Sequence, residues 1–140
     1  MSGYKAVLDA CVLVNACLRD TTLRLAEEPR LYIPLWSAEI LEETARTLKG
    51  PNFGLTDLQV AHLMDRMQNA FPEAAVEDYG HLIGAMLNDP GDRHVLAAAT
   101  KAGADVIVTF NLRHFPRAAA DPVGVAVQKP DDFLVHQFHL

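Results

Sequence analysis

Two short apolar runs, far apart in the chain, constrain the fold most because each leads directly into a polar side chain. The first run, residues 4–8 (YKAVL), ends at Asp9, and the second, residues 105–109 (DVIVT), ends near Asn111. Continuous runs of this length are typical of parallel strands that are covered on both faces. We expect weaker strands at residues 31–33 and 123–127.

Helical patterns separate these strands, and proline or glycine interrupts them. They cover residues 37–49, 56–71, 81–87, 91–102 and 130–138. Strands and helices that alternate in this way predict an α/β fold, a three-layer α/β/α domain with a mostly parallel sheet. Because 140 residues suit one compact core, we expect a single domain over residues 1–140.

The composition excludes several classes of protein. Half of the residues are hydrophobic, but no apolar run approaches the roughly 18 residues that a membrane span needs. The start of the chain does not resemble a secretory signal, so we expect a cytoplasmic protein with no membrane partner. The two cysteines, Cys11 and Cys17, are too few and too close together for a disulfide scaffold, and we expect them to pack.

The formal net charge of −6 argues against a protein that holds nucleic acid by its own charge. That mode of binding requires clustered lysine and arginine. An acidic protein that handles polyanions therefore needs bound cations, and these require several carboxylates in one place.

Asp9 is the first candidate for such a carboxylate. Ligand sites in open parallel sheets lie beyond the carboxyl ends of the strands, where we expect both Asp9 and Asn111. Aspartate is also a good helix cap, so Asp9 could instead cap the helix that follows. Its position in the sequence leaves both interpretations open.

Glu43 is the glutamate of the helix over residues 37–49 that is best placed to reach a cleft. On a helical projection it flanks the apolar stripe, whereas Glu39 and Glu42 lie nearly opposite that stripe. The alternative is that all three glutamates form a solvated face with the nearby Arg46 and Lys49.

Asp92 lies on the stripe of its helix that also contains Val95, Leu96 and Ala99. A carboxylate on an apolar stripe needs a partner or a metal ion, because a buried unpaired charge is costly. Its place in the first helical turn also allows capping. Asp89, three residues earlier, could be the helix cap or a second ligand.

Several carboxylates in one place suit hard cations such as Mg²⁺ and Mn²⁺. The reaction that such a site would naturally catalyse is phosphodiester hydrolysis.

Four segments resemble the PIN-domain nuclease family, and in particular its VapC-type toxin ribonucleases. They are KAVLD, IPLWSAEILEETARTL, NDPGDRHVLAAATKAGADVIVTFNLRHFP and VAVQKPDDFL. The third is the most specific. The resemblance implies an endoribonuclease that depends on Mg²⁺ or Mn²⁺, in which water on the ion attacks RNA.

The resemblance also implies roles for individual residues. Its catalytic and metal-binding set is Asp9, Glu43 and Asp92. We add Asp89 and Asn111 as further candidate metal ligands, and Thr109, Arg93 and Arg113 as candidate contacts to the RNA backbone, since the arginine fork fits phosphate oxygens. The sequence departs from the family at Cys11, where asparagine is common, and at Asn111, where aspartate is common.

Other functions remain open on the sequence alone. A phosphatase could use Asp9 as nucleophile, but Cys11 stands where its general acid would be. A catalytically weakened PIN-like module could bind RNA or protein without cutting. A toxin would have an antitoxin as partner. The apolar set of the helix over residues 56–71, which includes Met64 and Met67, suits the core or a homodimer.

Overall fold

The computed structural model describes residues 3–139 and contains one sheet of four parallel strands. The strand order is β2-β1-β3-β4. The bounds are Lys5–Leu8 for β1, Ile33–Leu35 for β2, Val106–Val108 for β3 and Ala126–Gln128 for β4. We predicted a mostly parallel sheet, and in the structure all three strand pairings are parallel.

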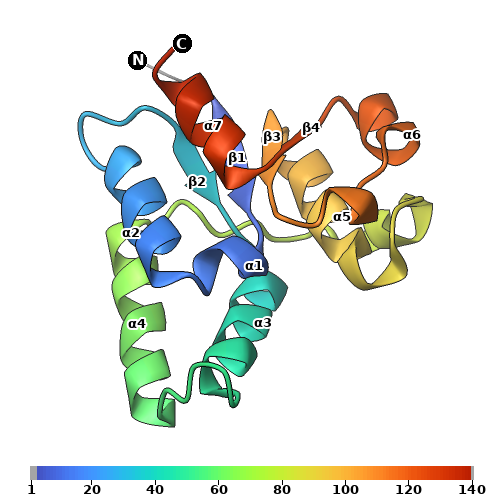
Figure 1. The fold of residues 1–140 in the computed structure, drawn as a ribbon. Helices are drawn as coiled ribbons and strands as arrows, with labels where there is room; N and C mark the ends of the chain where they lie inside the picture. Colours follow the sequence, from blue (N-terminus) through green and yellow to red (C-terminus); the bar gives the residue numbers. More distant parts are fainter. Residues whose placement is uncertain (1–2, 140) are drawn as a thin grey trace.

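The two central strands form the floor of the core. Ala6, Val7 and Leu8 in β1 are fully buried, and so are all three residues of β3. Side chains of a strand alternate between the two faces of its sheet, so burial of successive residues requires cover on both faces. Helices provide that cover on each side (Figure 1). The predicted three-layer α/β architecture is therefore confirmed.

The edge strands differ most from the prediction. We expected a strand at residues 31–33 that stopped before Pro34, but β2 continues through Pro34, which lies opposite Ala6 of β1. An edge strand tolerates proline because one row of its backbone groups needs no partner. The last strand starts at Ala126 rather than Val123, because a 3₁₀ turn and Gly124, whose φ is +73°, precede it.

Four of the predicted helices agree with the structure to within one or two residues. They are α3 (Ala38–Lys49), α4 (Asp57–Ala70), α5 (Arg93–Ala102) and α7 (Pro130–Gln137). Ser37 caps α3 through the backbone N–H of Ile40, and a capping box between Thr56 and Gln59 begins α4. Residues 81–87 were predicted to be helical and form a 3₁₀ helix, η1 (Gly80–Ala85).

The sequence prediction missed the segment between β1 and β2. It contains α1 (Ala10–Leu13) and α2 (Ala16–Leu25), and a further short helix, α6 (Arg117–Ala120), precedes β4. Only Thr22 is fully buried in α2, so the helix lacks the wide apolar stripe that reveals a helix in sequence. Within residues 3–139, no helix has the length and apolarity needed to cross a membrane.

Candidate metal centre

The candidate site lies at the carboxyl end of β1 and β3, where the sequence predicted it. Asp9 follows β1 directly, and its backbone N–H donates to the carbonyl oxygen of Val108 in β3 at 3.1 Å. This hydrogen bond ties the start of the site to the centre of the sheet. Thr109 follows β3 and is also fully buried. The rigid central strands therefore hold Asp9 and Thr109 side by side.

Asp9 both caps a helix and faces the pocket, so its two predicted interpretations hold together. Its Oδ1 accepts the backbone N–H of Ala10 at 2.8 Å, which caps α1. Its Oδ2 accepts the hydroxyl of Thr109 at 2.8 Å. Only 4% of the residue is exposed. Burial raises the pKa of Asp9, the hydrogen bond from Thr109 opposes this rise, and the negative charge of Asp92 adds to it.

Glu43 reaches the same pocket from α3. The residues predicted for the inward stripe of this helix, Ile40, Leu41, Thr44 and Leu48, are all buried. Glu43 flanks them with 35% of its side chain exposed, and its Oε1 lies 2.9 Å from Nε2 of His94. Its neighbour Glu42 is exposed. Because Glu43 is half-buried and paired, the interpretation of all three glutamates as a solvated face is wrong for this residue.

Burial is also the largest influence on the pKa of Glu43, which lies above its usual value. His94 lowers this pKa, whereas the negative charges of Asp9 and Asp92 raise it. Three carboxylates thus interact electrostatically, although they lie far apart in the chain. Such repulsion favours any cation that can bind between them.

Asp92 points toward the pocket instead of capping its helix. It is the last residue of the 3₁₀ turn η2 (Pro90–Asp92), and its side chain makes no capping hydrogen bond to α5. Its Oδ2 instead lies 2.6 Å from Nδ1 of His114, and 15% of its side chain is exposed. The capping explanation for Asp92 is therefore wrong, and the carboxylate has the inward orientation that the stripe predicted.

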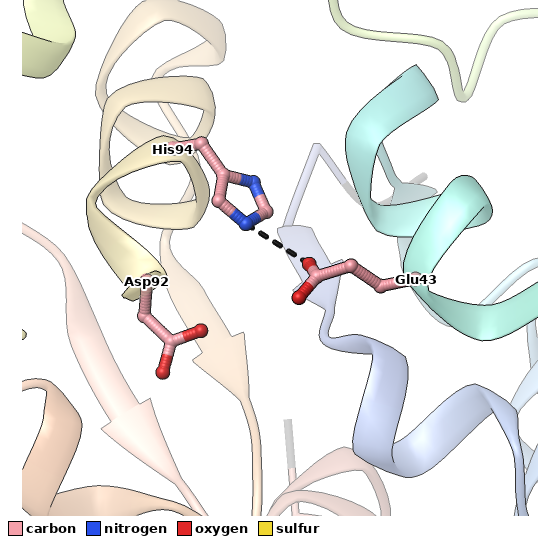
Figure 2. Close-up of side chains that lie close together, drawn as sticks. All are labelled: Glu43, Asp92 and His94. Carbon is pink, nitrogen blue, oxygen red and sulfur yellow. Dashed lines mark ion pairs between the residues drawn. The ribbon is translucent and has the colours of Figure 1, made fainter. Parts of the chain in front are cut away.

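Four of the predicted site residues line one pocket of about 270 Å³. They are Asp9, Glu43, Asp92 and Asn111, and the rest of the lining comes from Ala10, Cys11, Val14 and Thr47. Glu43 and Asp92 come close to His94, with one donor atom of each residue within 4.8 Å of the others. Figure 2 shows Glu43 on α3 facing Asp92 and His94 at the start of α5. Larger hollows elsewhere lack this convergence of acids.

The remaining predicted residues lie around this pocket and do not line it. Asp89 is exposed and accepts the backbone N–H of Gly91 at 3.2 Å, so it caps η2. It also has an oxygen within 4.8 Å of donor atoms of Asp92 and His114. The Nε of Arg93 donates to the carbonyl oxygen of Asn88 at 3.1 Å. Arg113 is exposed and borders a separate hollow beside β4.

Thr109 has a contact that the sequence did not predict. We expected it to contact the RNA backbone, but its side chain is fully buried and its hydroxyl donates to Asp9. The same oxygen accepts the backbone N–H of Asn111 at 3.0 Å. In the structure, Thr109 therefore orients Asp9 and the loop after β3.

Cys11 packs against the carboxylate side of the site. Its Sγ lies 3.4 Å from Oγ1 of Thr109 and accepts the backbone N–H of Phe110 at 3.4 Å. Burial raises the pKa of this thiol, and the nearby charge of Asp9 raises it further. The thiol is therefore neutral at physiological pH, as expected for a packing role.

Sequence reasoning missed two histidines that contact the predicted acids. His94 pairs with Glu43, and His114 pairs with Asp92. A signal for His94 was available, since it lies three and four residues before Ala97 and Ala98 in a helix whose residues 95–99 are all buried. A helix that is apolar on nearly all sides must bury its polar residues too. No comparable pattern marks His114, which is in the 3₁₀ turn η3 (Leu112–His114).

The donor set of this pocket suits a hard divalent cation. Carboxylate and amide oxygens are the ligands that Mg²⁺ and Mn²⁺ prefer, and Asp9, Glu43, Asp92 and Asn111 present them to one space. A cation there would relieve the repulsion that raises the pKa values of Asp9 and Glu43. The residues present therefore fit such an ion.

Comparison with known proteins identifies a family and a relative that this chain resembles. The family model described as "PIN domain" matches residues 5–113, which include every predicted site residue. A protein of Mycobacterium tuberculosis named "Putative ribonuclease VapC50" is 49% identical over 72 residues. That alignment covers 51% of this chain and 43% of the relative, so it spans less than half of the relative's length.

Proposed function

From the premise that the chain belongs to the PIN-domain family, we propose that it is a metal-dependent endoribonuclease that hydrolyses phosphodiester bonds in RNA. The observation that carries the proposal is the meeting of Asp9, Glu43 and Asp92 at one pocket, from three separate parts of the chain. The name of the aligned relative, which includes the word ribonuclease, supports the choice of RNA. Within residues 3–139, most of the buried apolar residues, from β1 to α7, form one cluster, which supports a single domain over residues 1–140.

In this proposal Asp9, Glu43 and Asp92 hold the catalytic cation and Asn111 adds a neutral oxygen. Mg²⁺ or Mn²⁺ supplies, when bound, Lewis-acid polarisation of the phosphodiester and activation of water. Thr109 and the backbone N–H of Ala10 fix both oxygens of Asp9, which limits its motion. Asp89 lies near Asp92 and His114 but does not line the pocket, and we assign it to a second, weaker ion.

The arginines near the acids are proposed to contact the RNA backbone. Arg113 is exposed two residues after Asn111, so its guanidinium is free to pair with a phosphate. Arg93 is half-buried against Asn88 and would contribute only with its unbonded nitrogens. Because the hydroxyl of Thr109 is engaged with Asp9, we assign Thr109 to positioning rather than to substrate contact.

We further propose that the protein acts on cytoplasmic RNA as the toxin of a toxin–antitoxin pair and forms a homodimer. The aligned relative's VapC designation supports the antitoxin partner. For the homodimer, the predicted surface is the apolar set of α4, in which Met67 is buried but Leu58 is 81% exposed. Sedimentation at high concentration tests the homodimer, and a monomer there would contradict it.

The proposed activity is tested with purified protein and a mixed RNA pool. We expect cleavage with Mn²⁺ or Mg²⁺ and none with EDTA, because the acids alone cannot activate water against a polyanion. Cleavage that persists in EDTA would indicate a contaminating metal-independent ribonuclease. Absence of cleavage under every metal condition would favour a PIN-like module that binds RNA or protein, consistent with the unusual Cys11 and Asn111.

Metal binding should also stabilise the folded protein. The unfolded chain does not bring the three carboxylates together, so Mn²⁺ binds the folded state preferentially. At a concentration about 100 times its Kd, Mn²⁺ should raise the free energy of unfolding by about 2.7 kcal/mol. Urea denaturation with Mn²⁺, with Mn²⁺ and EDTA, and with NaCl of matched ionic strength measures this effect. Equal stability in all three solutions would contradict a specific metal site.

A further inference from the structure

His94 contacts the carboxylate cluster directly, although it is not an acid. Its Nε2 lies 2.9 Å from Oε1 of Glu43. Donor atoms of Glu43, Asp92 and His94 all lie within 4.8 Å of one another. In Figure 2 the imidazole extends from α5 toward Glu43, on the side of the helix start that also carries Asp92. The three side chains thus form a cluster of two carboxylates and one imidazole.

The spacing within this cluster is that of ligands around one ion. Neighbouring ligands at right angles on an ion with bonds of about 2.1 Å lie about 3.0 Å apart, and opposite ligands lie about 4.2 Å apart. The separation of 2.9 Å between Nε2 of His94 and Oε1 of Glu43 matches the first value. All donor atoms of the cluster lie within 4.8 Å of one another, a bound somewhat larger than the second value. Small side-chain movements would therefore complete the coordination.

The environment of His94 also directs Nε2 to this cluster. Only 11% of the side chain is exposed. Its Nδ1 is buried and has no hydrogen-bond partner among residues 3–139, so the polar contact of the ring is concentrated at Nε2. His114 differs, because 44% of its side chain is exposed and it contacts Asp92 from the loop after β3. His62 instead serves as the control residue, because it is exposed on α4 and belongs to neither group of possible metal ligands among the described residues.

We propose that His94 is a metal ligand through Nε2, which makes the site a mixed nitrogen and oxygen site that prefers Mn²⁺ to Mg²⁺. This inference rests on the proposed metal-dependent function. Imidazole is a good ligand for first-row transition ions, whereas Mg²⁺ strongly prefers oxygen. An alternative role, in which His94 only orients Glu43, predicts no bond between nitrogen and metal, and it predicts that replacing His94 weakens the binding of both ions equally.

The direct test is pulsed electron paramagnetic resonance of Mn²⁺ bound to the intact protein. Protein labelled only at histidine with ¹⁵N should show ¹⁵N coupling to Mn²⁺, and this coupling should disappear in His94→Gln but persist in His62→Gln. Bound Mn²⁺ with no histidine nitrogen coupling in the wild-type protein would overturn the proposal. So would coupling that persists in His94→Gln.

Affinities give a second readout that separates a ligand from a positioning residue. His94→Gln should weaken Mn²⁺ binding by at least the roughly 10- to 100-fold that loss of a supporting group costs a metal site, and it should weaken Mg²⁺ binding much less. Equal weakening of both would indicate that His94 only orients Glu43, and would overturn the proposal. Nitrogen coupling without RNA cleavage would refute the proposed nuclease and leave His94 as a ligand. If Mn²⁺ failed to bind at all, both the proposed metal-dependent nuclease and the proposed His94 ligand would be refuted.

Discussion

Replacing Glu43 with Gln is expected to lower RNA cleavage by about 100- to 1000-fold, while Glu42→Gln leaves it close to the wild-type rate. Glu43 lines the acidic pocket, and its neighbour Glu42 is exposed. The substitution keeps the shape of the side chain but removes one negative charge from the proposed ligand set. Loss of about 3–4 kcal/mol of transition-state stabilisation corresponds to this range of rates.

The comparison of these two variants controls for helix stability and for net charge, since both change one glutamate of α3 by the same chemistry. Initial rates of cleavage of one labelled RNA at a fixed Mn²⁺ concentration measure the effect. Similar rates for Glu43→Gln and wild type would contradict a catalytic role for Glu43. Similar losses in both variants would point to the helix or to overall charge instead of the pocket.

The convergence at this pocket was predictable because the topology of parallel strands is regular. Asp9 and Asn111 each follow an apolar run, and strands that run in the same direction end at the same edge of a sheet. Glu43 was found by helical periodicity, since the four buried residues of α3 define one stripe. These inferences needed only the order and the period of apolar residues.

The helical projection predicted the orientation of the Asp92 side chain correctly, although one of its assumptions was wrong. It assumed one helix from Gly91, whereas residues 90–92 form a 3₁₀ turn and α5 begins at Arg93. The turn arises at Asp89 and Pro90, where the Asp89 carboxylate accepts the backbone N–H of Gly91. Patterns of apolar residues do not distinguish these two helix types, so the change of period at Asp92 was invisible in the sequence.

Contacts between side chains were the least predictable part of the site. The pairs His94–Glu43 and His114–Asp92 join segments that are distant in the chain, and their formation depends on how α3 and η3 pack against α5. The hydrogen bond from Thr109 to Asp9 likewise joins residues 100 positions apart. No local rule gives such distances, because they depend on tertiary packing that only the folded chain defines.

Asp9→Asn should abolish metal-dependent cleavage and, at neutral pH and without metal, make the protein more stable by about 0.5–2 kcal/mol, the range typical of stabilising substitutions. Burial raises the pKa of Asp9 above its ordinary value of 3.8. At neutral pH the ionised carboxylate therefore destabilises the folded state, and the neutral amide removes this destabilisation. Urea denaturation in EDTA at pH 7.5 measures this difference.

The amide can keep the hydrogen bonds of Asp9. Its oxygen can accept the N–H of Ala10, and its nitrogen can donate to Thr109, whose hydroxyl oxygen has two lone pairs and already accepts the N–H of Asn111. The hydroxyl hydrogen of Thr109 then turns toward Sγ of Cys11, 3.4 Å away. The substitution therefore exchanges a charge for a dipole, and it costs only the long 3.9 Å hydrogen bond that Sγ of Cys11 donates to Oδ2 of Asp9.

The dependence on pH distinguishes this explanation from a general gain in packing. Because its folded pKa is raised, neutral Asp9 contributes stability that is fully present below pH 3.8 and is lost as the pH rises through the folded pKa. Asparagine does not titrate, so the advantage of Asp9→Asn should be small at pH 3.5 and reach a plateau at neutral pH. An advantage of equal size at both pH values would show that desolvation of the Asp9 charge is not its cause.

A less stable variant at pH 7.5 would mean that the hydrogen bonds of the Asp9 carboxylate stabilise it more than burial destabilises it. The proposed cation would then bind a carboxylate whose charge the metal-free fold already stabilises. The expected result means instead that the ionised Asp9 destabilises the metal-free fold and that the cation removes this cost when it binds.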